Sequence, residues 1–401
     1  MTPLQEKIIR LITMQGPIDI SRYMLMAMAD SEHGYYKTAN PFGRAGDFIT
    51  APETSQMFGE MIAVWVLVTW QNMGGPAPFL LCETGPGRGT LMDDILRTIG
   101  KLAPECFAAA RIALAETSPR LATIQREKLH IYGTKAEWIK DLEKLPDLPL
   151  VLIANELFDV LPIHQYVSGN GAFHERMISV DQNGNLCFSL EHVPVSRDQL
   201  TDRIMRLSEN PEHQSASAKT DETSVSPGDD RTLAAAPAEK LPDGTVIEIS
   251  PARLALARQI SEHLAKNTGA ALIIDYGALE PGFGDTLQAM SKHSFRNPLE
   301  NPGTYDLTSH VDFASLARVA HSAGCHTASL TQGDFLIKLG LLERAGQLGA
   351  DKDETLRQRI IADVKRLAAP DQMGELFKVL CIADPQTAMP PFPWEISGGG
   401  S

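Results

Sequence analysis

The sequence predicts an α/β protein with a doubly wound, Rossmann-like parallel sheet. A short apolar run from Phe79 to Leu81 leads into a glycine-rich segment at 85–89, and a helical pattern follows from Leu91 to Ile99. Strand-like and helical segments then alternate along the chain, and polar residues end several of the strand-like runs. A strand followed by a tight loop and then by the first turn of a helix is the geometry of a nucleotide-type pocket.

Each further strand of the expected sheet is an apolar run that ends in a polar residue. We expect a second strand at 111–115, ending in Glu116, and a helix opened by the Ser-Pro pair at 118–119. The run at 150–154 has the composition of a strand buried on both faces, and 271–274 is another such run.

Helices are expected at both ends of the chain. The apolar spacing predicts a helical N-terminal lead-in at 3–14 and 21–28. A polar loop at 42–56 and a buried helix at 57–70 are expected to follow it. Towards the C-terminus the spacing predicts a helix at 311–323 and a short strand at 326–330. Two further helices are expected at 335–342 and 354–367.

An insertion interrupts the expected alternation. Alternating strands with turn pairs between them predict a β-meander at 163–167, 173–180 and 186–190. Residues 208–240 carry almost no large apolar side chains, so we expect a disordered insertion. A strand at 245–249 and a helix reaching Leu264 then resume the α/β alternation.

These segments predict a core in two pieces with additions around it. We expect an N-terminal helical extension with an active-site loop at 1–75, and a cofactor-binding core made of 76–160 and 241–345. Between the two pieces of the core we expect the β-meander at 161–207 and the disordered insertion at 208–240, and after the core a C-terminal helical segment at 346–396.

Composition limits the partners and the compartment. The formal net charge of −14 argues against nucleic acid or an anionic membrane as the main partner. Five widely spaced cysteines indicate buried thiols in a reducing compartment, and neither disulfides nor a zinc site. His164, His174, His310 and His321 show no ligand spacing, so no metal is expected. No apolar run is long enough for a membrane span, and the N-terminus lacks the features of a signal or transit peptide.

The spacing of the loop glycines points to a cofactor. A dinucleotide fingerprint would require glycine at position 90, where this chain has Thr90. Glycines at 85, 87 and 89 fit the E/D-x-G-x-G-x-G loop of S-adenosylmethionine (SAM) methyltransferases. We therefore expect S-adenosyl-L-methionine as the cofactor, contacted by Glu83, Gly85, Pro86, Gly87 and Gly89. The alternative is a Gly/Pro surface turn between a strand and a helix.

Polar residues at strand ends complete the predicted pocket. Glu116 is placed to accept both ribose hydroxyls, while Glu83 either supports the loop or pairs with the cofactor's ammonium. Asn155, Glu156 and Asp159 follow the strand that faces the transferable methyl group. Two carboxylates there can hold a guanidinium bidentately. The alternative is that Asn155 and Asp159 cap a short helix.

Motifs along nearly the whole chain resemble those of the MidA family of SAM-dependent methyltransferases. The first matching segments are GDFITAPETSQMFGE at 46–60, ETGPGRGTL at 83–91, ETSP at 116–119 and NELFD at 155–159. The later ones are IDYG at 274–277, DLTSHVDF at 306–313, TQGDFL at 331–336 and MGELFKV at 373–379.

The resemblance implies a protein arginine methyltransferase that makes symmetric dimethylarginine on a core subunit of respiratory complex I during its assembly. It also implies that Asp47, Thr50 and Glu53 close the pocket from the N-terminal side. The expected catalytic residues are thus Glu53, Asn155, Glu156 and Asp159, and the expected cofactor contacts also include Asp47, Thr50, Glu116 and Asn155. A bacterial member would work in the cytoplasm and its eukaryotic relatives in the mitochondrial matrix, and a homodimer is left open. The alternatives are an assembly chaperone that binds SAM with little turnover, and methylation of a small molecule.

Overall fold

The computed structural model describes residues 1–38, 50–133, 136–201, 241–280, 282–291 and 294–393, so the insertion predicted at 208–240 lies outside the described residues. The chain divides into two compact units, each of which is treated by itself below. Unit 1 comprises Met1–Pro41, Val160–Ala257 and Glu280–Arg318, and unit 2 comprises Phe42–Asp159, Arg258–Leu279 and Val319–Ser401. Among the described helices, none combines the length and apolar character that a bilayer crossing requires.

A mixed sheet forms the centre of unit 2, with the strand order β15-β16-β10-β5-β2-β3-β4. Its strands are β2 (Phe79–Thr84), β3 (Ala110–Ala115), β4 (Glu137–Ile139), β5 (Leu150–Asn155), β10 (Gly269–Ala278), β15 (His326–Thr331) and β16 (Phe377–Ala383). The five neighbouring strands β4, β3, β2, β5 and β10 are parallel to one another, whereas β16 is antiparallel to both β10 and β15.

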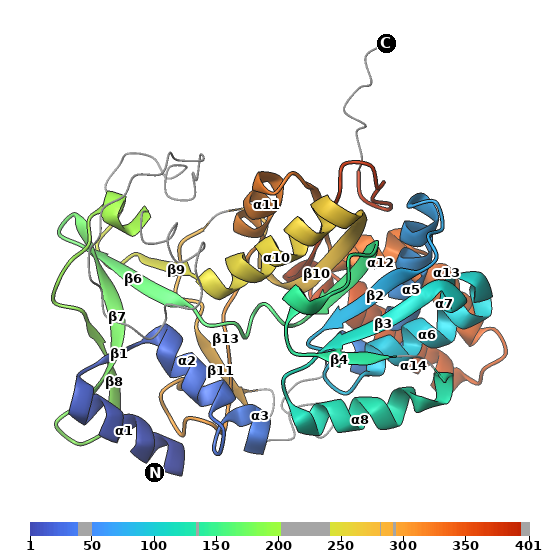
Figure 1. The fold of residues 1–401 in the computed structure, drawn as a ribbon. Helices are drawn as coiled ribbons and strands as arrows, with labels where there is room; N and C mark the ends of the chain where they lie inside the picture. The colour runs from blue at the N-terminus through green and yellow to red at the C-terminus, as the bar shows by residue number, and fades with distance from the viewer. Residues whose placement is uncertain (39–49, 134–135, 202–240, 281, 292–293, 394–401) are drawn as a thin grey trace. The chain divides into compact units, whose positions relative to one another are not determined.

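Helices cover both faces of this sheet (Figure 1). All residues of β2 are buried, and because successive side chains in a strand point to opposite faces, both faces must be covered. The helices are α4 (Ala51–Thr54), α5 (Gln56–Asn72), α6 (Thr90–Leu102), α7 (Pro104–Ala109), α8 (Pro119–Leu129), α12 (Gln332–Lys338), α13 (Leu341–Gly349), α14 (Glu354–Ala368) and α15 (Met373–Leu376), with the 3₁₀ turns η1 (His130–Tyr132) and η2 (Leu142–Lys144). The doubly wound α/β fold predicted from the sequence is therefore confirmed.

Unit 1 packs the N-terminal helices against antiparallel strands. One sheet has the order β1-β7-β6-β9 with β8 also paired to β7, and a second has the order β12-β11-β13. The elements are α1 (Pro3–Gln15), β1 (Ile18–Asp19), α2 (Ile20–Ala29), α3 (Tyr35–Thr38), β6 (His164–Gly169), β7 (Ala172–Val180), β8 (Leu186–Leu190), β9 (Val246–Ile249), β11 (Gln288–Ser291), β12 (Ser294–Arg296), β13 (Asp306–Thr308) and β14 (Val311–Asp312). Ile8, Tyr23, Ile178 and Leu307 share its core, so three distant stretches of sequence stabilise one another. Helices α10 (Pro251–Asn267) and α11 (Phe313–Ser322) begin in unit 1 and continue into unit 2.

Four segments differ from the sequence-based expectation. The C-terminal end was expected to be helical, yet β16 enters the central sheet because its residues 379–383, VLCIA, are a continuous apolar run that suits a buried strand. The strand expected to resume the α/β alternation, β9, instead pairs antiparallel with β6 of the meander. The helix expected at 311–323 begins only at Phe313, and the helix expected at 335–342 is two helices separated at Gly340, which has a φ of +98°.

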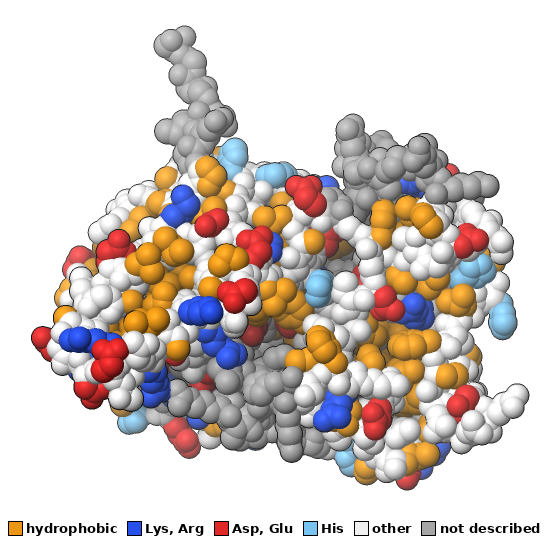
Figure 2. Space-filling view, turned by 180° about the vertical axis from the view of Figure 1, so that it is seen from behind, with side chains coloured by type: hydrophobic (Ala, Val, Ile, Leu, Met, Phe, Trp, Pro, Cys, Tyr) orange, Lys and Arg blue, Asp and Glu red, His pale blue; other side chains and the backbone are white. Residues whose placement is uncertain are grey.

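Charges of both signs are interspersed among apolar side chains on the face seen in Figure 2. Mixed charges of this kind keep a surface soluble without creating one strong field.

Candidate active site

The order in which the chain adds strands to the central sheet reverses between β2 and β5. From β2 the chain proceeds outward through β3 and β4, and it then returns to place β5 and β10 on the other side of β2. In open α/β sheets the crevice for a ligand lies outside the carboxyl ends of the strands at such a point. The glycine-rich loop follows β2, and β5 ends at Asn155 with residues 156–159 directly after it, so both lie at this crevice.

The glycine-rich loop needs glycine for its backbone. Gly85, Gly87 and Gly89 have φ values of +65°, +50° and +74°, a region that other residues rarely adopt. A Cβ added to Gly85 would lie 2.9 Å from Leu157 Cδ1, so the loop touches the segment after β5. With Pro86 between the first two glycines, the turn is closed by the Gly89 N–H, which donates to Pro86 O at 2.7 Å.

A buried carboxylate lies below the loop, in β2. Glu83 is 3% exposed, and burial raises its pKa to about 8. The Met92 N–H donates a hydrogen bond to this carboxylate, but Glu83 Oε2 has no hydrogen-bond partner among the described residues. An orphaned buried oxygen is costly, so the site fits a ligand that supplies a donor such as an ammonium group.

The end of β3 carries the second carboxylate, Glu116. Its Oε1 accepts from the Ser118 N–H at 2.6 Å, and its Oε2 accepts from Gln125 Nε2 at 3.0 Å. Burial raises the pKa of Glu116, and these hydrogen bonds act against that rise. The carboxylate is therefore fixed at the strand end where ribose hydroxyls were expected.

Gln125 is a site residue that the sequence analysis missed. Its Nε2 also donates to Gly87 O at 2.8 Å, and its Oε1 accepts from Trp138 Nε1 at 2.8 Å. The side chain thus joins Glu116 to the glycine loop, and it is fully buried. A signal was present, because Gln125 is the polar member of the otherwise apolar buried face of α8, with Leu121, Ala122 and Leu129.

The segment after β5 holds a third carboxylate in a strained backbone. Glu156 has a φ of +50°, and its Oε1 accepts from the Ala51 N–H at 3.1 Å and from Asn155 Nδ2 at 3.2 Å. Burial raises the pKa of Glu156 to about 7. Asn155 Oδ1 is buried and has no hydrogen-bond partner among the described residues. The crevice therefore contains a second acceptor atom that lacks a donor.

Asp275 fixes the course of the chain beyond Glu156. Its Oδ2 accepts from the N–H groups of Phe158 and Asp159, at 2.9 and 3.1 Å. Asp159 is buried, and residues 156–161 form bends and turns rather than a helix. The alternative that Asn155 and Asp159 cap a short helix was therefore wrong.

Residues 50–54 connect the loop after β2 with the segment after β5. Thr50 O accepts from the Glu53 N–H at 3.0 Å at the start of α4, and Glu53 Oε1 accepts from Thr90 Oγ1 at 2.7 Å. The next residue of the same turn, Ala51, binds Glu156 as described above. The structure thus brings Thr50 and Glu53 to the predicted pocket, whereas Asp47 lies outside the described residues.

Comparisons with known proteins show what the chain is similar to. A family of S-adenosyl-L-methionine-dependent methyltransferases matches residues 61–331. The mitochondrial protein arginine methyltransferase NDUFAF7 of Xenopus laevis is 30% identical over 391 residues, which cover 92% of this chain and 81% of that protein. Its Drosophila melanogaster homologue is 31% identical over 92% of this chain and 82% of its own length. A COG1565 superfamily member from Burkholderia thailandensis, bound to S-adenosyl-homocysteine, has a TM-score of 0.75 at 25% identity and covers 96% of this chain and 92% of its own.

Proposed function

Because the chain belongs to this family of S-adenosyl-L-methionine-dependent methyltransferases, and its methyl donor is therefore SAM, we propose that it methylates arginine in a protein substrate. The relatives named as protein arginine methyltransferases support this choice of acceptor. The finer proposal is symmetric dimethylation of an arginine on a core subunit of respiratory complex I. It rests on the family resemblance of the motifs, and the mitochondrial names of the relatives agree with it.

The observation that carries the proposal is the half-buried Glu156 carboxylate, next to the Leu157 side chain that the glycine loop approaches. A guanidinium is planar and binds a carboxylate through two parallel hydrogen bonds. Glu156 would hold two of its nitrogens and draw the positive charge away from the third, while Asn155 Oδ1 accepts from a remaining N–H. In methyl transfer the third nitrogen would attack the methyl carbon, the carbon–sulfur bond would break with release of S-adenosyl-homocysteine, and the methylated nitrogen would pass one proton to solvent water. The main task of the protein is therefore alignment.

The remaining roles follow from where each group lies. Gly85, Pro86, Gly87 and Gly89 would pass the cofactor close to the backbone, and Glu116 held by Gln125 would accept both ribose hydroxyls. Glu83 would either pair with the cofactor's ammonium or support the loop. Thr50 and Glu53 would close the pocket, and Asp159 would add a second carboxylate on the acceptor side. The family resemblance gives the same closing role to Asp47, which lies outside the described residues.

A labelled-methyl assay with a quinone-side complex I subunit tests the proposal. We expect transfer by the wild type, recovered after hydrolysis as symmetric dimethylarginine. Glu156→Gln should abolish transfer while SAM binding, measured by calorimetry, persists. Glu137→Gln serves as the control, because Glu137 is exposed on β4. Subunit binding without transfer by the wild type would favour the assembly chaperone that retains SAM, and label on a small molecule instead of protein would contradict the proposal.

A further inference from the structure

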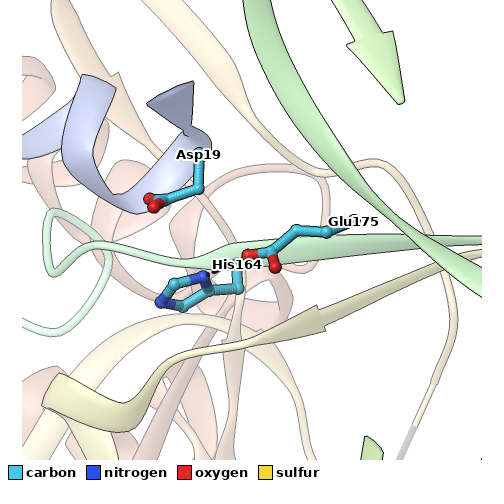
Figure 3. Close-up of side chains that lie close together, drawn as sticks. All are labelled: Asp19, His164 and Glu175. Carbon is cyan, nitrogen blue, oxygen red and sulfur yellow. Dashed lines mark hydrogen bonds and ion pairs between the residues drawn. The ribbon is translucent and has the colours of Figure 1, made fainter. Parts of the chain in front are cut away.

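Unit 1 contains a cluster of metal-ligating side chains that the proposed methyl transfer does not use. It consists of Asp19 at the end of β1, His164 at the start of β6 and Glu175 within β7 (Figure 3). One ligand atom from each residue lies within 4.8 Å of the ligand atoms of the other two. The three residues come from separate elements, so no sequence spacing could have announced them.

The pairing of the strands explains why these side chains meet. Strand β1 pairs with β7 at Ile178 and Met177, and Asp19 is the residue opposite Met177. Strand β6 pairs with β7 beginning at Glu175, and His164 precedes that paired stretch by two residues. Because side chains two residues apart in a strand point to the same face, all three ligands project from one face of the sheet.

The side chains are also held in place before any ion binds. His164 Nδ1 lies 2.7 Å from Glu175 Oε1, and the two side chains are only 13% and 12% exposed. Asp19 Oδ1 accepts from the Arg22 N–H at 2.7 Å and so caps α2. Figure 3 shows the Glu175 carboxylate turned toward the His164 ring, with the Asp19 carboxylate close to the same ring.

We propose that Asp19, His164 and Glu175 bind one divalent transition-metal ion of the zinc type. One imidazole nitrogen and two carboxylate oxygens are ligands that Zn²⁺ accepts at about 2.0–2.2 Å, with water completing the tetrahedron. Ligand atoms around such an ion lie roughly 3.3–3.5 Å apart, so modest side-chain rotation closes the set seen here. Mg²⁺ and Ca²⁺ suit the set less well, because they prefer oxygen ligands alone.

The bound ion would link the N-terminal segment to the strands of the meander and stabilise their packing. Asp19 joins β1 to α2, whereas His164 and Glu175 belong to the strands β6 and β7. An ion that binds only the folded arrangement stabilises it by mass action. The competing account is a cross-strand hydrogen bond between His164 and Glu175 that needs no ion.

Zinc titration of the full-length chain, after treatment with a chelator, distinguishes the two accounts. A chromophoric chelator in competition gives the affinity, and elemental analysis after dialysis gives the stoichiometry. We expect one Zn²⁺ per chain and a rise in Tm. Both His164→Gln and Glu175→Gln should weaken binding about tenfold or more. His174→Gln is the matched control, because His174 adjoins Glu175 on β7 and instead contacts Glu191 O at 2.9 Å.

Two additions keep the test decisive. Asp19→Asn preserves a capping side chain, so it should fold and still lose affinity for Zn²⁺. Co²⁺ in place of Zn²⁺ should give a spectrum without a thiolate-to-metal band, which separates this site from one at the partly exposed Cys187. Absence of zinc from the wild type, equal affinity in the folded variants, or a thiolate band would each overturn the proposal.

Discussion

Glu156 adopts the left-handed region, with a φ of +50°, although it has a side chain. Such a backbone costs of order 1–3 kcal/mol and persists where the surroundings fix it, often at functional sites. Here the Glu156 N–H donates to Ile274 O at 2.9 Å, and the side chain accepts from Ala51 and Asn155. The sequence identified Glu156 by its position after a strand, but nothing in the local sequence indicated the strain.

Replacing Glu156 by glutamine should change the pH dependence of stability. Burial raises the pKa of this carboxyl from 4.5 to about 7, so between these values the folded chain keeps a proton that the unfolded chain releases. The contribution of Glu156 to the free energy of unfolding therefore falls as pH rises through this window. Glutamine does not titrate, so the urea midpoint of Glu156→Gln should rise relative to that of the wild type as pH increases from about 4.5 to about 7, and the difference should level off above that range. A constant difference across that range would contradict the assigned burial.

Gln125 should control the affinity for SAM through Glu116 and Gly87. Gln125→Leu removes hydrogen bonds from both partners and leaves buried acceptors unsatisfied, which costs about 1–3 kcal/mol. We expect calorimetry to give a Kd for SAM that is about tenfold higher or more. Gln358→Leu is the control, because Gln358 lies on the exposed side of α14, where its Nε2 donates a hydrogen bond to Glu354 of the same helix. Equal affinity in both variants would remove Gln125 from the cofactor site.

At the scale of elements, Gly85 in the loop between β2 and α6 and Gly133 after the turn η1 allow a matched pair of glycine substitutions. Gly85 and Gly133 have φ values of +65° and +55°, so alanine strains both backbones similarly. A Cβ at Gly85 meets Leu157, whereas a Cβ at Gly133 has nothing within 4 Å. Gly85→Ala should therefore lose SAM binding in calorimetry, and Gly133→Ala should retain it. Loss in both variants would point to strain instead of contact at the crevice.

The elements found from the sequence are those whose signal is local. The strands β2, β3 and β5 are apolar runs that end in Thr84, Ala115 and Asn155, and α8 has a serine cap whose Oγ accepts from Leu121 N–H. Strand β16 was missed because a short apolar run is compatible with a buried helix as well as a buried strand. Strand β9 was recognised as a strand, but its partner β6 lies far away in sequence, and pairing is a tertiary choice.

At the scale of the whole molecule, the division into units was beyond the reach of local patterns. Unit 1 draws on three separate stretches, which a linear succession of segments does not indicate. The Asp19, His164 and Glu175 cluster is hidden for the same reason, because its members meet only through strand pairing. Within unit 2, ion pairs also join helices that are distant in sequence.

Glu60 should be a major contributor to the stability of unit 2. It lies on α5 and pairs with Arg97 of α6 and Arg344 of α13, with side-chain exposures of 5%, 30% and 32%. Removing one partner of a buried ion pair costs about 3–5 kcal/mol, and the partial exposure of the arginines lowers our expectation for Glu60→Gln to about 2 kcal/mol. Urea denaturation measures this loss. The control is Asp147→Asn, whose exposed pair with Lys266 should contribute nothing measurable. A similar midpoint shift in both variants would contradict the special weight given to Glu60.

The most direct test of the proposed activity is mass spectrometry of complex I arginines in the source cells. Complex I is purified from cells that lack this protein and from the same cells restored with the wild type or with Glu156→Gln. The proposed function predicts a dimethylated arginine on a core subunit in the wild-type restoration, and an unmodified arginine at that position in the other two. Identical methylation in all three samples, with complex I recovered from each, would contradict it.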